Sequence, residues 1–143
     1  MFSLNPPLVK VKTDGDVSYH TSGSACFDIP INEDYTLAPH ILHNYTTGLS
    51  VELPDGWCLL VFLRSSIGQK MCIIPNSVGV IDSDYRGEIK IPLINLSDNP
   101  IPFFKGQRIA QGLVTLAPQA RLLKVSSLSS SERGIGGFGS TGS

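Results

Sequence analysis

Residues 49–63 read L-S-V-E-L-P-D-G-W-C-L-L-V-F-L and contain two strand patterns joined by a turn. Leu49 to Leu53 alternate apolar and polar residues, which is typical of a strand with one buried face. Pro54 to Gly56 predict a turn, because proline presets φ and glycine accepts a positive φ. Trp57 to Leu63 form a continuous apolar run, which indicates a buried strand. The stretch therefore predicts β structure on both sides of a tight turn.

Similar patterns recur along the chain, each bounded by turn residues. They predict further strands at residues 8–12, 89–94, 108–116 and 122–125. Pro92 interrupts the second of these and indicates an edge strand or a bulge. Helical periodicity is nearly absent, and we expect one short helix at Ser65–Met71 with Ser65 or Ser66 as its N-cap. These patterns predict an all-β fold of the sandwich, jelly-roll or barrel type.

The composition is that of one domain with little net charge. The 143 residues suffice for a single hydrophobic core, and the formal net charge is −1. A nucleic-acid binder should show a basic face, so we expect no nucleic-acid partner. A few well-placed arginines can still hold a small polyphosphate. Because only 16% of the residues are charged, we expect other subunits to cover part of the surface.

The cysteines and the apolar runs indicate in which cellular compartment the protein resides. Cys26, Cys58 and Cys72 are odd in number and far apart, so the pattern favours free thiols in a reducing compartment over disulfides or a zinc site. No apolar run approaches the roughly 20 residues that span a membrane, and the N-terminus lacks a signal-peptide pattern. We therefore expect a cytoplasmic protein without a membrane partner, or a nuclear one if the source is eukaryotic or viral.

The C-terminal residues 133–143 read R-G-I-G-G-F-G-S-T-G-S and contain a formal G-x-G-x-x-G match. A dinucleotide-binding loop needs a strand before it and a helix after it, and a Walker A loop needs a lysine; neither condition is met. Phe138 could stack on a base while Arg133 and backbone N–H groups meet phosphates. The alternative, which composition favours, is a disordered tail. A composition shift near Ser126 divides the chain into a β core, residues 1–125, and a flexible arm, residues 126–143.

Four other segments are unusual for a plain β scaffold. They are S-G-S-A-C-F-D at residues 22–28, R-S-S at 64–66, G-V-I-D-S-D-Y-R-G-E at 79–88 and G-Q-R-I-A-Q at 106–111. Each has a simple structural explanation when taken alone. Asp28 could be a turn former, Arg64 an exposed strand end, Gln111 a solvated side chain and D-x-D-Y-x-G a hairpin turn. Trp57 fits the core better than a site.

Taken in order, the five segments resemble the five motifs of the trimeric dUTP pyrophosphatases (dUTPases). The resemblance runs from Ser22 to Gly142, and the third and fifth motifs are the most specific. It implies a distorted jelly-roll β-barrel with one short helix. It also implies a homotrimer whose three active sites lie at subunit interfaces, each built from segments of all three chains.

The resemblance also implies a role for each matched residue. Asp82 matches the general base that activates water for attack on the α-phosphorus of dUTP, which releases pyrophosphate. Tyr85 matches the aromatic residue that lies against the deoxyribose and excludes a 2′-hydroxyl. Asp28 matches a residue that supports a metal indirectly, with Mg²⁺ mainly on the substrate phosphates. The other implied substrate-binding residues are Asn76, Gly79, Val80 and Ile81 at the base, Arg64, Ser65, Ser66 and Gln111 at the phosphates, and Arg133, Phe138, Gly139, Ser140 and Thr141 in the arm.

Two alternative functions stay open. Leu63-Arg64-Ser65-Ser66 departs from the usual P-R-S-G and also fits the related dCTP deaminases, but Pro92 lies near the position of their catalytic glutamate and cannot transfer protons. A nucleotide-gated interaction protein would use a surface such as residues 34–44 or 97–103 for a regulatory partner of unknown identity. The leading hypothesis is a magnesium-dependent dUTP diphosphatase. In a cell it would limit uracil incorporation into DNA and supply dUMP for thymidylate synthesis.

Overall fold

The computed structural model describes residues 5–137, and the statements below concern these residues. They form strands and one short helix, as the sequence predicts. The elements in chain order are β1 Lys10–Lys12, β2 Phe27–Pro30, β3 Tyr35–Leu37, β4 Leu42–Thr46, β5 Ser50–Glu52, β6 Trp57–Leu63, α1 Ser65–Gly68, β7 Cys72–Ile73, β8 Gly79–Ile81, β9 Lys90–Asn95, β10 Ile101–Phe103 and β11 Arg108–Leu116.

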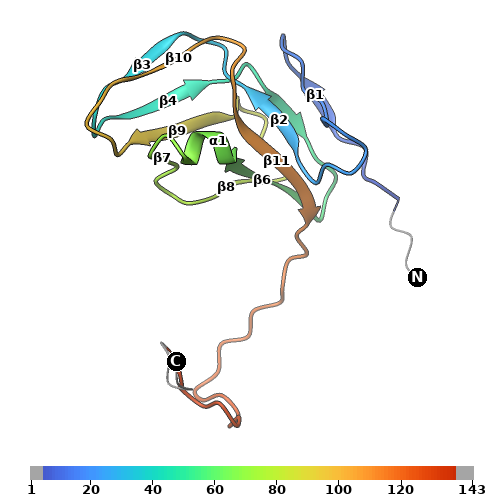
Figure 1. Cartoon of the computed structure of the whole chain (residues 1–143). Coiled ribbons are helices and arrows are strands. Elements are labelled where there is room, and N and C mark those ends of the chain that lie inside the picture. Colours follow the sequence, from blue (N-terminus) through green and yellow to red (C-terminus); the bar gives the residue numbers. More distant parts are fainter. Residues whose placement is uncertain (1–4, 138–143) are drawn as a thin grey trace.

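The strands pair into antiparallel sheets that surround one core (Figure 1). The largest sheet has the order β2-β11-β6-β8, and a second has the order β4-β9-β7. Two-stranded sheets β1-β5 and β3-β10 complete the body. In the largest sheet β6 and β11 pair from Trp57↔Leu116 to Leu63↔Ala110, which makes them its central strands.

The core follows from the alternation that the sequence shows. In β9, Ile91, Leu93 and Asn95 are buried, while Pro92 and Ile94 on the other face are half-buried. Apolar side chains from most of the strands join the inward residues of β9 in one cluster. Burial of this apolar surface is the main stabilising contribution to such a fold.

Several predicted elements agree with the structure, and two details do not. The predicted strands 57–63 and 108–116 coincide with β6 and β11. The strand predicted at 122–125 is wrong, because that segment has no pairing partner and Leu122 is 95% exposed. The helix ends at Gly68, and its N-cap is Arg64 rather than a serine. The side chain of Arg64 makes no cap hydrogen bond and pairs with Asp28 instead.

Pro92 lies within the paired strand β9, at a position where one edge of that strand is open. The β4 ladder covers β9 from Lys90 to Ile94, but β7 pairs only with Ile94 and Asn95. A strand tolerates proline where its nitrogen faces away from a partner. The prediction of an edge strand or a bulge at Pro92 is therefore wrong for the strand as a whole, because β9 is the central strand of its sheet, although β7 does not reach as far as Pro92.

Residues 117–137 follow β11 without forming a helix or a strand and lead away from the β body (Figure 1). This segment carries apolar side chains in full contact with solvent, including Leu123, Leu128 and Ile135. Among the described residues no helix is long and apolar enough to cross a membrane.

Candidate functional site

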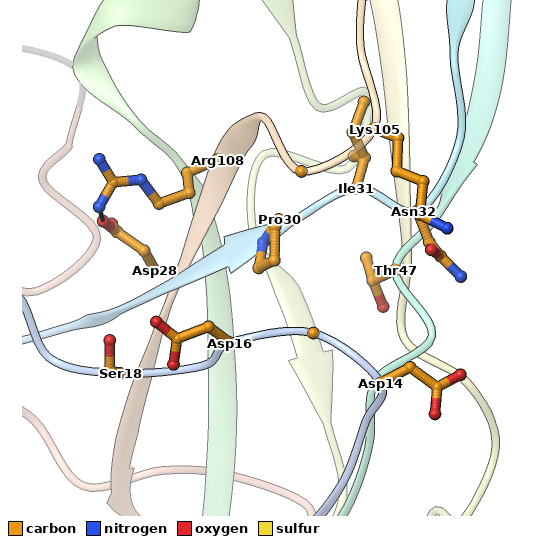
Figure 2. Close-up of a pocket in the computed structure, with 12 residues that line it drawn as sticks. Asp14, Asp16, Ser18, Asp28, Pro30, Ile31, Asn32, Thr47, Lys105 and Arg108 are labelled. Atoms are coloured by element: carbon orange, nitrogen blue, oxygen red, sulfur yellow. Dashed lines mark hydrogen bonds and ion pairs between the residues drawn. The ribbon is translucent and has the colours of Figure 1, made fainter.

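Asp28 holds two arginines at one end of the largest sheet. Its Oδ1 lies 3.1 Å from Nε of Arg64, and its Oδ2 accepts a hydrogen bond of 3.0 Å from Nη1 of Arg108. Figure 2 shows Arg108 directed at Asp28. The Asp28 side chain is only 13% exposed, so this is a partly desolvated, charge-assisted arrangement. We call Asp28, Arg64, Arg108 and Gln111 the arginine cluster.

The pairing of three strands explains why these residues meet. Gln111 in β11 lies opposite Asp28 of β2 on one side and Phe62 of β6 on the other. Its Nε2 donates a 3.2 Å hydrogen bond to the Leu63 carbonyl, immediately before Arg64. The cluster borders a cavity of about 420 Å³ to which Asp14, Asp16, Asn32 and Lys105 also contribute (Figure 2).

Ser65 and Ser66 open the short helix α1 next to this cluster. Both serines are exposed, whereas Ile67 is buried in the core and fixes the helix to the body. The hydroxyl groups therefore stand in solvent beside Arg64, which suits them to bind an anion such as a phosphate.

Both carboxylate oxygens of Asp28 are engaged by arginines, so they are not free to bind a metal directly. Among residues 5–137 no three His, Cys, Asp or Glu side chains form a group that could hold a metal ion. An indirect role for Asp28, through the arginines that it orients, fits these contacts. Burial, and secondarily the negative charge of Asp28, raise the pKa of the nearby Cys26 thiol, so this thiol stays protonated at neutral pH.

A second cavity, of about 670 Å³, lies between β8 and β9. Asp82 and Tyr85 line it together with Val80, Ile81 and Pro92. Because β8 is the last strand of its sheet, one of its edges has unpaired backbone groups. Val80 is 60% exposed, in keeping with an open edge. Gly79 starts β8 where a Cβ atom would lie 3.2 Å from Cβ of Val61, a tight approach that glycine permits.

Tyr85 is fixed by the turn that follows Asp82. Its N–H donates a 3.2 Å hydrogen bond to the Asp82 carbonyl, and its hydroxyl donates a 3.1 Å hydrogen bond to the Glu88 carbonyl. The ring lies directly against Gly87, where a Cβ atom would collide with the end of the tyrosine ring. Gly87 therefore determines where the ring of Tyr85 can lie.

Asp82 also faces a third cavity, of about 750 Å³, on the other side of the turn. Trp57, Cys58, Asp55 and Asp84 contribute to that cavity. The Asp82 carboxylate is exposed, so a water molecule and a substrate can both reach it.

The arginine cluster and Asp82 lie far apart within one chain. Ile81 pairs with Leu59, which places Asp82 beside Cys58 at the start of β6. Arg64 follows the other end of β6, six residues beyond Cys58, so at ~3.3 Å per residue the two sites are ~20 Å apart. This distance exceeds the reach of three linked phosphates.

The predicted site residues thus fall into three groups. Asp28, Arg64, Ser65, Ser66 and Gln111 gather at one end of β6. Val80, Ile81, Asp82 and Tyr85 line the cavity beside β8, with Gly79 starting that strand and Asn76 in the preceding loop, where its Nδ2 donates a 3.3 Å hydrogen bond to the Val78 carbonyl. Arg133 lies in the extended segment and donates from Nε to the Gly136 carbonyl. Phe138, Gly139, Ser140 and Thr141 lie outside the described residues.

Two residues of these groups escaped the sequence analysis. Arg108 stands in the G-Q-R-I-A-Q segment, which was noted only for Gln111. Gly87 is the last residue of the D-x-D-Y-x-G pattern. Its position two residues after Tyr85 could have indicated that it contacts the tyrosine ring. Arg108 contacts Asp28 and Gly87 contacts Tyr85, and the sequence analysis had indicated both of these partners.

Comparison with known proteins identifies the family. A family model described as dUTPase matches residues 15–142. The deoxyuridine 5'-triphosphate nucleotidohydrolase of Caulobacter vibrioides is 42% identical over 130 residues, which cover 87% of this chain and 84% of that protein. The enzyme of the same name from Anaeromyxobacter sp. is 42% identical over 145 residues, with 96% and 99% covered. The chain belongs to the dUTPase family.

Solved structures agree with this assignment. The Staphylococcus bacteriophage 80alpha dUTPase with dUPNHPP superposes with a TM-score of 0.86 at 26% identity, covering 98% of this chain and 100% of that chain. A mutant dUTPase from phage phi11 of S. aureus, described with a structural Mg(II) ion, has a TM-score of 0.78 at 19% identity and covers 88% of this chain and 100% of its own. These likenesses confirm the predicted dUTPase-like jelly-roll fold.

Proposed function

We propose that this protein is a dUTP diphosphatase, which hydrolyses dUTP to dUMP and pyrophosphate. The observation that carries the proposal is the cavity beside β8, where an exposed carboxylate and an aromatic ring adjoin an open strand edge in a chain of the dUTPase family. In a cell this activity would limit uracil incorporation into DNA and supply dUMP for thymidylate synthesis.

The open edge of β8 suits recognition of uracil. Uracil has two carbonyl acceptors flanking one N–H donor, a pattern that the N–H and C=O groups of a strand edge can meet. Gly79, Val80 and Ile81 supply that edge, and Asn76 in the preceding loop supplies a side-chain amide. Cytosine has an amino group in place of one carbonyl and would leave a buried donor unpaired. Such a mismatch is rejected by up to about 10⁴-fold.

Tyr85 would lie against the deoxyribose and leave no space for a 2′-hydroxyl. Its position depends on Gly87, against which the ring packs. The fixed ring is therefore the element that would separate dUTP from UTP.

Gly87→Ala is expected to displace the Tyr85 ring and to narrow the preference for dUTP over UTP by about 10–100-fold. Steady-state kcat/KM values for the two substrates measure this ratio. Gly23→Ala is the matched control, because a Cβ atom at Gly23 meets nothing within 4 Å. An unchanged ratio in the Gly87 variant would remove Tyr85 from this role.

Asp82 would act as the general base. Its exposed carboxylate would accept a proton from a water molecule as that water attacks the α-phosphorus, and pyrophosphate would leave. Magnesium fits this chemistry as a ligand of the substrate phosphates, where it would offset negative charge. Residues 5–137 offer no three-residue metal group of their own, so the phosphates are its expected ligands.

The arginine cluster would hold the phosphates. Asp28 binds the Nε of Arg64, and Nη1 of Arg64 donates a 3.4 Å hydrogen bond to the Arg108 carbonyl, so Nη2 is the nitrogen that would bind phosphate oxygens. Ser65, Ser66 and Gln111 supply neutral donors beside it. In this arrangement Arg108 and Asp28 are positioning residues rather than ligands.

The backbone separation of ~20 Å between Asp82 and Arg64 supports a site shared between chains, because three linked phosphates are much shorter than this distance. We therefore infer a homotrimer in which one chain supplies the cavity beside β8, the next supplies the arginine cluster and the third supplies the arm residues Arg133 and Phe138 to Thr141. The exposed leucines of residues 117–137 support close contact of this segment with another chain.

The direct test of the proposed function is pyrophosphate release with magnesium from dUTP, dCTP, dTTP and UTP, with ammonia measured in parallel. Release from dUTP alone is expected. Ammonia from dCTP would instead indicate a deaminase. Binding of dUTP without any release would indicate a nucleotide-gated interaction protein.

Mixing two inactive variants tests the shared site. Asp82→Asn and Arg64→Ala are each expected to have little activity. In trimers assembled randomly from equal amounts, about one quarter of the sites combine an intact Asp82 with an intact Arg64, so activity should recover to about that fraction. No recovery in co-assembled protein would place both residues of one site in the same chain.

A further inference from the structure

Glu88 is the last residue of the G-V-I-D-S-D-Y-R-G-E segment, and the proposed function gives it no role. It lines the cavity beside β8 together with Tyr85, yet its carboxylate binds a different part of the chain. Oε1 of this carboxylate accepts hydrogen bonds from two backbone N–H groups, at 3.1 Å from Thr47 and at 2.8 Å from Gly48. Thr47 and Gly48 form the bend between β4 and β5. Glu88 therefore ties the end of its segment to that bend.

The bend between β4 and β5 is held firmly by its own contacts. Thr47 is buried, and its hydroxyl donates a 2.5 Å hydrogen bond to the Ile89 carbonyl and accepts one of 3.1 Å from the Leu49 N–H. The Ile89 N–H donates a 2.8 Å hydrogen bond to the Leu49 carbonyl. Gly48 has a φ of +65°, which residues with a side chain rarely adopt. The bend is therefore a fixed point to which the Glu88 carboxylate attaches.

The turn of residues 82–87 has few attachments to the rest of the described chain. Nη1 of Arg86 donates hydrogen bonds of 2.6 and 3.3 Å to the Ser83 and Tyr85 carbonyls, both within the turn. Among residues 5–137, the side-chain hydrogen bond that leaves the turn is the 3.1 Å bond from the Tyr85 hydroxyl to the Glu88 carbonyl. The Tyr85 side chain is 45% exposed, so packing alone does not fix its ring.

The carbonyl that holds Tyr85 and the carboxylate that binds the bend belong to the same residue, Glu88. Without the carboxylate, two N–H groups at the bend would lose their acceptor, which is costly for groups away from solvent. The bend and residue 88 would move apart, and the Tyr85 ring would follow the Glu88 carbonyl. Asp82 depends less on this contact, because it directly follows Ile81, which is paired with Leu59 of β6.

We propose that Glu88 is a positioning residue for sugar recognition. Its carboxylate, bound to the bend at Thr47 and Gly48, fixes the carbonyl that holds Tyr85 against the deoxyribose. The inference rests on the proposed function and adds a residue that acts on the choice between dUTP and UTP through Tyr85, without a part in the chemical step.

Substitution of Glu88 tests the effect on substrate choice. Glu88→Ala is expected to narrow the preference for dUTP over UTP by about 10-fold, measured as the ratio of the two kcat/KM values. Glu88→Gln keeps an oxygen that can accept from both N–H groups, so its ratio should stay within about 2-fold of the unaltered protein. The kcat for dUTP should change less than the ratio, because Asp82 keeps its place. An unchanged ratio in folded Glu88→Ala would overturn the proposal.

Glu33→Ala is the matched control. Glu33 makes the same kind of contact one residue before the bend, where its Oε1 accepts hydrogen bonds of 2.6 Å from the Thr46 N–H and 2.9 Å from the Thr46 hydroxyl. Its other oxygen lies 3.3 Å from Nε2 of His43, on a different side from the turn of residues 82–87. This variant should lose thermal stability but keep the ratio. An equal narrowing in Glu33→Ala would mean that any lost anchor suffices, which would overturn the specific role of Glu88.

Gly48→Ala displaces the bend without altering Glu88. A Cβ atom at Gly48 would lie 3.3 Å from Nδ2 of Asn32, on a backbone with a positive φ, so the bend must shift. The preference for dUTP over UTP should narrow by about 3–10-fold. If folded Gly48→Ala keeps the full preference, the bend does not control Tyr85 and the proposal fails.

Fluorine NMR of protein labelled with 3-fluorotyrosine follows the ring without reference to catalysis. The chain has four tyrosines, and Tyr85→Phe assigns the signal of Tyr85. Glu88→Ala should shift or broaden this signal, and Glu33→Ala should leave it in place. An unmoved Tyr85 signal in Glu88→Ala would overturn the inference even where dUTP is hydrolysed. A moved signal in a protein that hydrolyses no dUTP would overturn the proposed function and leave the hold of Glu88 on Tyr85 standing.

Discussion

Replacing Asp82 with asparagine is expected to lower the rate of pyrophosphate release by about 10²–10⁴-fold, the contribution that a positioned base typically makes. The change keeps the size of the side chain and removes its ability to take a proton from water. Because Asp82 is exposed at the start of a turn, the substitution leaves the core untouched. Binding of the uncleaved analogue dUPNHPP, measured by calorimetry, should change little.

Asp84→Asn is the matched control. It alters an exposed carboxylate in the same turn, on the cavity that Asp82 also borders. It should keep most of the turnover, because the proposal gives Asp84 no proton to accept. If the Asp82→Asn variant hydrolyses dUTP at nearly the rate of the unaltered protein, the general base must be another group.

Deleting residues 133–143 is expected to leave a folded trimer with kcat/KM for dUTP reduced by about 10²–10³-fold. The deletion removes Arg133 from the phosphates and Phe138 from the base, and base stacking alone contributes about 1–3 kcal/mol. The described contacts of Arg133 are local, since its Nε donates to the Gly136 carbonyl. The thermal unfolding midpoint and the mass in solution should therefore stay the same.

A point variant tests whether the loss of Arg133 itself, rather than the loss of the whole segment, lowers the activity. Arg133→Ala should reproduce part of the loss, whereas Arg121→Ala, an exposed arginine earlier in the same extended segment, should not. Full activity in the deletion variant would mean that the C-terminal residues are a tail without a role in catalysis.

The central strands could be predicted because their patterns are complete in the sequence. Residues 57–63 are a continuous apolar run and residues 108–116 are a longer, mostly apolar segment, and each forms a strand over those residues. The short segment 122–125 is also rich in apolar residues but pairs with no strand among residues 5–137, so the pattern alone was misleading. Short strands such as β3 and β10 escaped prediction, because three residues carry too little periodicity to detect.

The site could be predicted as a set of residues but not as an arrangement. The order of the five segments indicated Asp28, Arg64, Asp82, Tyr85 and Gln111. Their division into two groups at opposite ends of β6 depends on the register between β6 and β8, which no local pattern specifies. The support that Gly87 gives to Tyr85 likewise depends on where one ring lies.

Pro92 has a consequence for what can occupy the cavity beside β8. Val80 and Ile81 of the edge strand β8 line that cavity together with Pro92 of β9, where β7 does not pair. An unpaired strand edge beside such a space can pair with the backbone of a peptide as an extra strand. A proline on one side denies such a peptide a continuous ladder, because it offers no N–H. A ligand in this cavity therefore finds backbone hydrogen-bonding groups at β8 and a proline ring at β9, which suits a flat, compact molecule better than a strand that pairs on both sides.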